Sequence, residues 1–162
     1  IRNAIKDSFV ELIKEKYLST EAVAGVATGA IAQGALVADA LKLPFMYIRS
    51  EAKGHGLENL IEGDPQKGQK VVVIEDLIST GGSSLGAVKA LREAGCEVLG
   101  MAAIFTYEFS RATSGFTEAG CELHTLSNYT TLISTAVDTG CITDHDVETL
   151  KKWRLDPAGW GR

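Results

Sequence analysis

The sequence lacks the features that mark several large classes of protein. Its three cysteines are an odd number and are widely spaced, so neither a disulfide framework nor a zinc site is indicated. Sixteen Lys and Arg face 21 Asp and Glu, and this net charge of −5 provides no broad basic surface for nucleic acid or an anionic membrane. There is no signal-peptide pattern and no apolar run of membrane-spanning length. We therefore expect a cytoplasmic protein with reduced thiols.

Strand and helix patterns alternate along the chain, without a repeat or linker that would divide it. At 162 residues and 45% hydrophobic composition, the chain can bury one sizeable core. Apolar runs predict strands at 22–27, 45–48, 71–74, 98–105 and 121–126. Helical spacing predicts helices at 1–17, 31–41, 83–94, 111–120 and 129–139, and a last one capped by Thr143 or Asp144. This order predicts an α/β fold, with a mainly parallel central sheet and helices on both faces, as a single domain over residues 1–162.

The most informative stretch is residues 71–84, VVVIEDLISTGGSS. Four β-branched residues without polar alternation indicate a strand buried on both faces. Glu75 and Asp76 come at its carboxyl end, where open α/β sheets bind ligands. The small, hydroxyl-rich loop that follows leads into a helix, so its backbone N–H groups can surround an anion at the helix N-terminus. An ordinary turn would leave the adjacent acids unexplained.

Two acids beside an anion site suit a ligand that carries both a phosphate and neighbouring hydroxyl groups. A ribose 5-phosphate is such a ligand, because carboxylates accept hydrogen bonds from its 2- and 3-hydroxyls while the loop holds the phosphate. The glycines are not followed by Lys-Ser/Thr, as they would be in a Walker loop, and no G-x-G-x-x-G dinucleotide fingerprint occurs.

The hydrophobic run, two acids and Thr/Ser/Gly loop resemble the phosphoribosyl pyrophosphate (PRPP) motif of type I phosphoribosyltransferases. The resemblance implies the fold of that family and PRPP contacts from the whole motif: Glu75, Asp76, Leu77, Ile78, Ser79, Thr80, Gly81, Gly82 and Ser83. A second loop, at Thr28 and Gly29, follows the first predicted strand and is similar to the pyrophosphate loop of the family. Taken alone, that loop fits a plain connection equally well.

A long polar segment, residues 50–68, separates the two loops, and segments of this length are often functional lids. Arg49, Lys53 and His55 are basic residues in and next to it, although solvated loop charges are the simpler alternative. Residues 48–56, IRSEAKGHG, are similar to the flexible catalytic loop of orotate phosphoribosyltransferases. Ser50 stands where that family usually has a second lysine, so the charge of the site differs from the common form.

The resemblance to orotate phosphoribosyltransferases covers nearly the whole chain, through the C-terminal RLDPAGW. It implies transfer of ribose 5-phosphate from PRPP to orotate, giving orotidine 5'-monophosphate and pyrophosphate in the synthesis of pyrimidine nucleotides (UMP). Lys53, His55 and Asp76 would be the catalytic residues, and Ser79 would also lie near orotate. The alternatives are a transferase for another nucleobase and a non-catalytic regulator that senses PRPP or nucleotides.

The same resemblance implies Mg²⁺ as cofactor, without a protein residue assigned as its ligand, and a homodimer with shared active sites. The family carries an N-terminal segment that helps to enclose orotate, and we expect residues 1–162 to lack it. His124 and His145 have no second ligand at metal spacing, so structural or surface roles are favoured for both. Trp153 and Trp160 are expected to anchor the C-terminal segment to the core or to a partner subunit.

Overall fold

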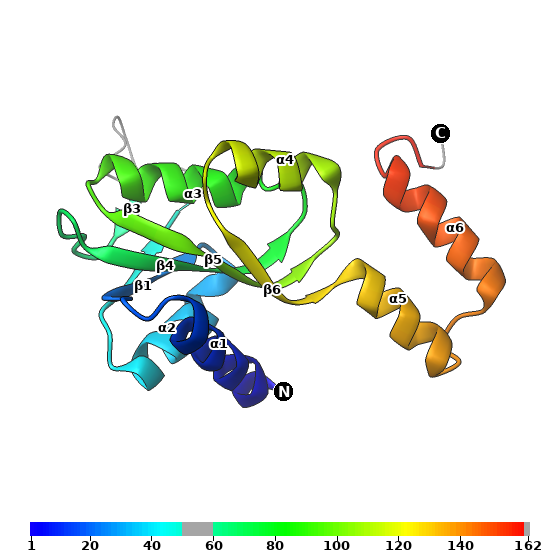
Figure 1. The fold of residues 1–162 in the computed structure, drawn as a ribbon, viewed down its shortest axis with the longest axis horizontal. Coiled ribbons are helices and arrows are strands. Elements are labelled where there is room, and N and C mark those ends of the chain that lie inside the picture. Colours follow the sequence, from blue (N-terminus) through cyan, green and yellow to red (C-terminus); the bar gives the residue numbers. More distant parts are fainter. Residues whose placement is uncertain (50–59, 161–162) are drawn as a thin grey trace.

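The computed structural model describes residues 1–49 and 60–160 and contains a central six-stranded sheet (Figure 1). The strands lie in the order β3-β2-β1-β4-β5-β6, and all neighbours are parallel except β2 and β3. Their bounds are β1 Ala22–Val26, β2 Phe45–Ile48, β3 Ile61–Glu62, β4 Lys70–Ile78, β5 Glu97–Thr106 and β6 Leu123–Asn128. The helices are α1 Arg2–Lys16, α2 Ala30–Leu41, α3 Gly82–Glu93, α4 Ser110–Glu118, α5 Tyr129–Asp138 and α6 Asp144–Leu155. The predicted α/β class and mainly parallel sheet are confirmed.

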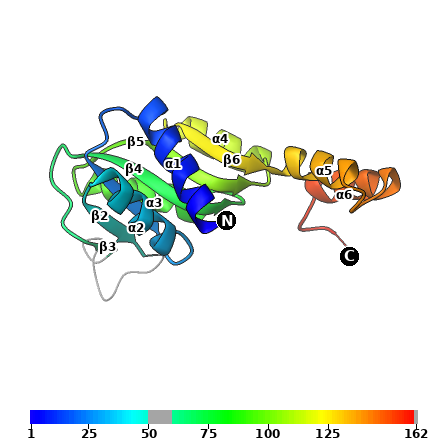
Figure 2. The same ribbon diagram turned by 90° about the horizontal axis from the view of Figure 1, so that it is seen from below.

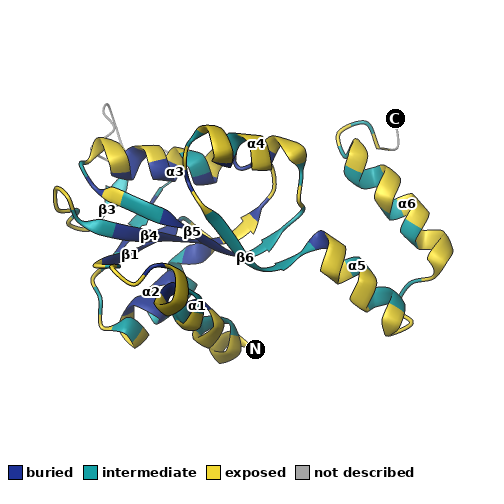
Figure 3. Ribbon diagram, viewed as in Figure 1, coloured by how far each residue is buried: buried dark blue, intermediate teal, exposed yellow. Residues whose placement is uncertain are grey.

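The sheet is buried on both faces, which explains the uninterrupted apolar run in β4. Val71 and Val73 pack in the cluster under α3 and α4, whereas Val72 and Ile74 pack in the cluster under α1 and α2. Successive strand residues point to opposite faces, so each face receives two of the four. Figure 1 shows one helix pair on each side of the sheet, and Figure 3 shows the buried strands between them.

The order of the strands reverses direction between β1 and β4. The chain passes from β1 through α2 to β2 on one side, and from β4 through α3 to β5 on the other. Gly25 of β1 lies opposite Ile74 of β4, so the loops after these two strands emerge side by side. Such a reversal point is where open α/β sheets bind ligands.

One strand end and one whole strand differ most from the sequence-based expectation, while β6 lies two residues later than predicted. Strand β4 does not end before the acids but continues to Ile78, because it pairs with β5 as far as Ile78 opposite Thr106. Strand β3 was not predicted. It has two residues and pairs antiparallel with β2, with Ile61 opposite Ile48. A strand this short leaves no periodic pattern in a sequence.

Helices α5 and α6 and the segment after them form a C-terminal hairpin (residues 129–160) that projects from the edge of the sheet (Figures 1 and 2). Thr143, one of the two caps that the sequence offered, caps α6 through a capping box with Asp146. Trp153 packs against Tyr107 and Phe109 at ring-centroid distances of 5.5 and 5.9 Å, which confirms its predicted anchoring role. Within the described ranges, none of the helices is long and apolar enough to span a membrane.

Candidate active site

The loop after β4 forms an open anion site at the start of α3. Ser79, Thr80, Gly82 and Ser83 are exposed there. The residue before the helix is Gly81, whose φ of 81° is left-handed and favours glycine. Since glycine has no side chain to accept hydrogen bonds from the first turn, the N–H groups at the start of α3 are available to an anionic ligand.

The two adjacent acids have different surroundings. Asp76 is exposed, whereas Glu75 is 4% exposed and faces the interior. The Ser84 hydroxyl donates to Glu75 Oε2 at 2.8 Å, and the Asp76 backbone N–H donates to Glu75 Oε1 at 3.0 Å. Burial raises the pKa of Glu75 to about 7, and the hydrogen bond from Ser84 offsets part of that rise. The structure therefore leaves Asp76 accessible to a ligand and ties Glu75 to α3.

The loop after β1 meets Asp76. Thr28 and Gly29 are exposed and follow a cis peptide bond between Ala27 and Thr28. The Asp76 carboxylate lies so close to Gly29 that a Cβ atom at this position would overlap it. The structure thus brings together the two loops that the sequence singled out, at the carboxyl ends of neighbouring parallel strands.

Arg49 stands at the end of β2, the strand next to β1. Its Nη1 is 3.3 Å from Glu62 Oε1, and its backbone N–H donates to the Leu60 carbonyl at 2.8 Å. These contacts hold Arg49 in place directly before residue 50, where the predicted lid begins. Lys53 and His55, to which the sequence assigned catalytic roles, lie outside the described residues, and their roles stay predictions.

A cavity of about 750 Å³ lies on the other side of the β4 loop. It is lined by residues from three regions: Ser79, Thr80, Glu108, Phe109, Ser110, Arg111, Thr130, Arg154, Leu155, Pro157 and Ala158. Sequence reasoning selected only the first two of these. The others are loop and helix-start residues without a motif and residues of the C-terminal RLDPAGW, which the sequence marked only as part of the family resemblance. Only the fold brings them together.

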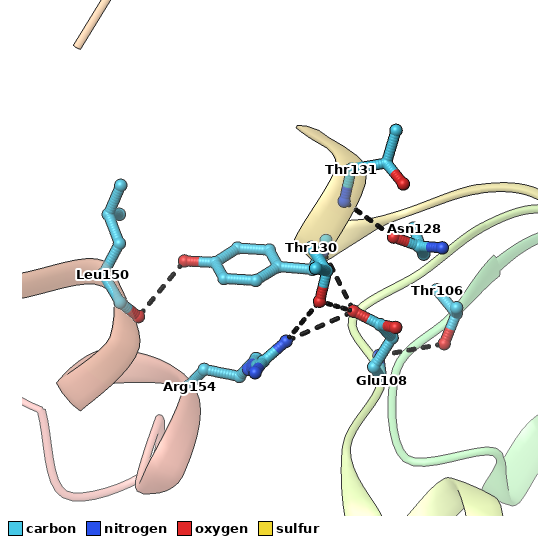
Figure 4. Close-up of polar contacts among 8 residues, drawn as sticks. Thr106, Glu108, Asn128, Thr130, Thr131, Leu150 and Arg154 are labelled. Carbon is cyan, nitrogen blue, oxygen red and sulfur yellow. Dashed lines mark hydrogen bonds and ion pairs between the residues drawn. The ribbon is translucent and has the colours of Figure 1, made fainter. Parts of the chain in front are cut away.

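Glu108 joins three of the surrounding elements (Figure 4). Its Oε2 accepts from the Thr130 backbone N–H at 2.9 Å and from the Thr130 hydroxyl at 2.5 Å. Arg154 Nη1 lies 3.2 Å from the same oxygen and donates to the Thr130 hydroxyl at 2.9 Å. The Arg154 guanidinium also lies over the Tyr129 ring, 5.6 Å from its centroid. One carboxylate oxygen therefore connects the loop after β5 to both helices of the C-terminal hairpin.

The remaining candidates lie outside these loops. His124 on β6 contacts Glu122 and the edge of the Tyr17 ring, and His145 is exposed on α6. Cys96 and Cys121 are buried, and burial raises the pKa of both thiols, while Cys141 is exposed. The expected structural or surface roles of the two histidines agree with these positions.

Comparison with known proteins gives one consistent result. Residues 1–122 match the phosphoribosyl transferase domain family. The chain is 57% identical over 160 residues to an orotate phosphoribosyltransferase of Bacteroides thetaiotaomicron, covering 99% of this chain and 76% of that protein. Two of the similar solved structures are orotate phosphoribosyltransferases. The orotate phosphoribosyltransferase of Aeropyrum pernix has a TM-score of 0.74 at 31% identity and covers 82% of this chain and 74% of its own. The orotate phosphoribosyltransferase of Mycobacterium tuberculosis, in complex with PRPP, has a TM-score of 0.65 at 28% identity. The match covers 78% of this chain and 72% of that protein.

The family match spans most of the chain, and the similarity to the Bacteroides protein extends through the C-terminal hairpin. The family match and this similarity agree with the structure, in which the loops after β1 and β4 meet where the strand order reverses. The chain belongs to the orotate phosphoribosyltransferase family.

Proposed function

We propose that the protein transfers the ribose 5-phosphate of PRPP to orotate and releases pyrophosphate, a step in pyrimidine nucleotide (UMP) synthesis. The observation that carries the proposal is the contact between Asp76 and Gly29, which joins a phosphate loop and a second anion loop in one site. A donor with a phosphate at one end and a pyrophosphate at the other needs such a pair. The solved relative in complex with PRPP supports the same donor.

The reaction requires the protein to position two ligands and to stabilise charge. The bond from ribose C1 to pyrophosphate breaks with its electron pair leaving on pyrophosphate, and a ring nitrogen of orotate bonds to C1 as its proton passes to the departing pyrophosphate or to solvent. Positive charge develops on the ribose ring and negative charge on the leaving group. Fixed charges and N–H groups placed for this change lower the barrier without a covalent nucleophile.

Each predicted site residue then has a role. The loop from Ser79 to Ser83, which follows the PRPP-motif residues Leu77 and Ile78 of β4, would hold the 5-phosphate at the start of α3, with Ser79 also near orotate. The exposed Asp76 would accept hydrogen bonds from the ribose hydroxyls and place negative charge near the ribose cation. The buried Glu75 would keep the strand end and α3 in register through Ser84, which is a positioning role. The sequence suggested instead that Glu75 binds the ribose directly.

The leaving group would be held on the β1 and β2 side of the site. Thr28 and Gly29 would bind pyrophosphate, together with Arg49, which follows the neighbouring strand β2. Lys53 and His55 would close over it and exclude water, so that PRPP is not hydrolysed. These lid roles follow from the family resemblance.

Mg²⁺, a homodimer with shared sites and a cytoplasmic location complete the proposal. Asp76 offers an exposed carboxylate at the proposed ribose position, against Gly29 of the proposed pyrophosphate loop, and carboxylate and phosphate oxygens are the donors that this hard ion prefers. The donor set therefore fits Mg²⁺, held mainly by oxygens of PRPP. When bound, the ion would neutralise part of the charge on pyrophosphate.

The first test is loss of orotate absorbance after mixing with PRPP and Mg²⁺, beside adenine, hypoxanthine and uracil. We expect consumption of orotate alone. Asp76→Asn should reduce turnover strongly, and Asp138→Asn, at the exposed end of α5, is its matched control. Consumption of another base would overturn the specificity, and PRPP binding without consumption of any base would favour a regulator.

A further inference from the structure

The cavity beside Ser79 and Thr80 has an outer wall made by the C-terminal hairpin. Arg154, Leu155, Pro157 and Ala158 line it opposite the β4 loop. Its volume of about 750 Å³ lies within the range of small-molecule sites, roughly 300–1,000 Å³. It adjoins the proposed phosphate loop on the side away from Gly29, so a ligand there would be a neighbour of ribose rather than of pyrophosphate.

The charges that line the cavity favour an anionic ligand. Glu108 and Arg154 form an ion pair at 3.2 Å and largely compensate each other. Arg111 also lines the cavity and is exposed, and within residues 1–49 and 60–160 it has no ion-pair partner. The guanidinium of Arg111 could therefore pair with the carboxylate of a flat acceptor base.

The outer wall depends on few contacts. Helix α6 has no buried residue, so burial of an apolar stripe does not hold it in place. It is held by Trp153 in the aromatic cluster and by Arg154, which reaches Glu108 and Thr130 (Figure 4). Glu108 has a φ of 59°, a left-handed conformation that is unusual for a residue other than glycine. This conformation is part of the geometry by which its carboxylate reaches both helices of the hairpin.

We propose that the C-terminal segment, residues 154–158, is the outer wall of the acceptor-base subsite, and that Glu108 and Arg154 are positioning residues that hold it there. The inference rests on the proposed function. It says which residues lie opposite the β4 loop on the far side of the same site. Neither residue of the pair belongs to the two loops that the proposed function assigns to PRPP. Its loss should therefore weaken binding of the base and leave binding of the donor unchanged.

The test compares Arg154→Ala, Arg154→Lys and the control Lys151→Ala, whose side chain pairs with Glu148 on α6 away from the cavity. We expect Arg154→Ala to raise the KM for orotate about tenfold, as loss of one charge-assisted contact would, while the Kd for PRPP by calorimetry stays within about twofold. Arg154→Lys should restore most of the orotate KM, and Lys151→Ala should match wild type.

The inference would be overturned if Arg154→Ala weakened the binding of orotate and PRPP equally, or if it left the KM for orotate unchanged. If Arg154→Ala fails to fold, Glu108→Gln carries the same expectation, because it removes the charge but keeps the shape of the side chain. Wild-type protein is assayed first. If it binds PRPP and consumes no orotate, the proposed function fails, whereas normal wild-type turnover with unaffected variants refutes only the role of the hairpin.

Discussion

The Asp76 carboxylate packs against Gly29 at a place where no side chain fits between them. Residue 29, in the loop after β1, must therefore be glycine for Asp76, near the carboxyl end of β4, to keep its position. We expect Gly29→Ala to displace Asp76 and to lower PRPP affinity by about tenfold or more, with the fold retained. Calorimetry with PRPP and a thermal melt measure the two effects.

The matched control for this substitution is Gly86→Ala in α3, where an added Cβ meets open space. It should leave PRPP binding unchanged and stabilise the protein by about 0.5–1 kcal/mol, the usual gain on replacing a helical glycine by alanine. Equal PRPP affinity for Gly29→Ala and wild type would show that Asp76 does not need its present position.

Glu75 makes the stability of the protein depend on pH. Its pKa rises from 4.5 to about 7 on folding, so between these values the folded protein keeps a proton that the unfolded chain releases. Stability from this group is therefore complete below about pH 4.5 and is lost as the pH rises toward about 7. Wild type should lose free energy of unfolding relative to Glu75→Gln across this window, measured by urea denaturation at several pH values.

Two further variants sharpen this prediction. Ser84→Ala removes a hydrogen bond that lowers the pKa of Glu75, so the loss of stability should begin at the same pH but continue to a higher pH. Glu97→Gln, at an exposed position on the neighbouring strand, is the control for removal of a carboxylate. A constant difference between wild type and Glu75→Gln from pH 5 to 8 would contradict a buried carboxyl with a pKa of about 7.

Lys53→Ala tests the lid that the sequence predicts. We expect turnover to fall by roughly two orders of magnitude or more, because a cation over the leaving pyrophosphate acts mainly in the transition state. The thermal melt should not change. Lys89→Ala, on the exposed face of α3, removes a lysine without that role. Near-normal turnover of folded Lys53→Ala would refute the assignment.

Arg111→Gln tests the charge in the cavity. Loss of the guanidinium should weaken orotate binding about tenfold and leave PRPP binding unchanged, because only the base carries a carboxylate on that side. Competition by orotate amide, which lacks the negative charge, should be the same for wild type and variant. Arg2→Gln at the exposed start of α1 is the control. If binding of orotate and its amide falls equally, Arg111 acts through packing.

Local patterns were sufficient to predict the core of this fold. Residues 71–74 are apolar at every position because both faces of β4 are covered, and that pattern is visible in the sequence. The two acids that follow are indistinguishable in the sequence. Only the pairing with β5 shows that β4 continues through both acids, which therefore point to opposite faces, Glu75 into the interior and Asp76 to the surface.

The hairpin contacts could not be predicted in this way. Glu108 meets Thr130 and Arg154 across 22 and 46 positions of the chain, and each residue alone looks like a surface polar group. Such contacts depend on where α5 and α6 pack, which periodicity does not specify. Trp153 was a usable signal, because a large aromatic residue in a polar helix needs a partner.

That packing has a practical consequence. Both tryptophans of the chain, Trp153 and Trp160, lie in the C-terminal hairpin, and Trp153 is within 5.9 Å of the Phe109 ring. The intrinsic fluorescence of the protein is therefore a reporter for this hairpin and not for the sheet. A shift in emission before any loss of far-ultraviolet circular dichroism would record the hairpin leaving its place while the rest of the fold is intact.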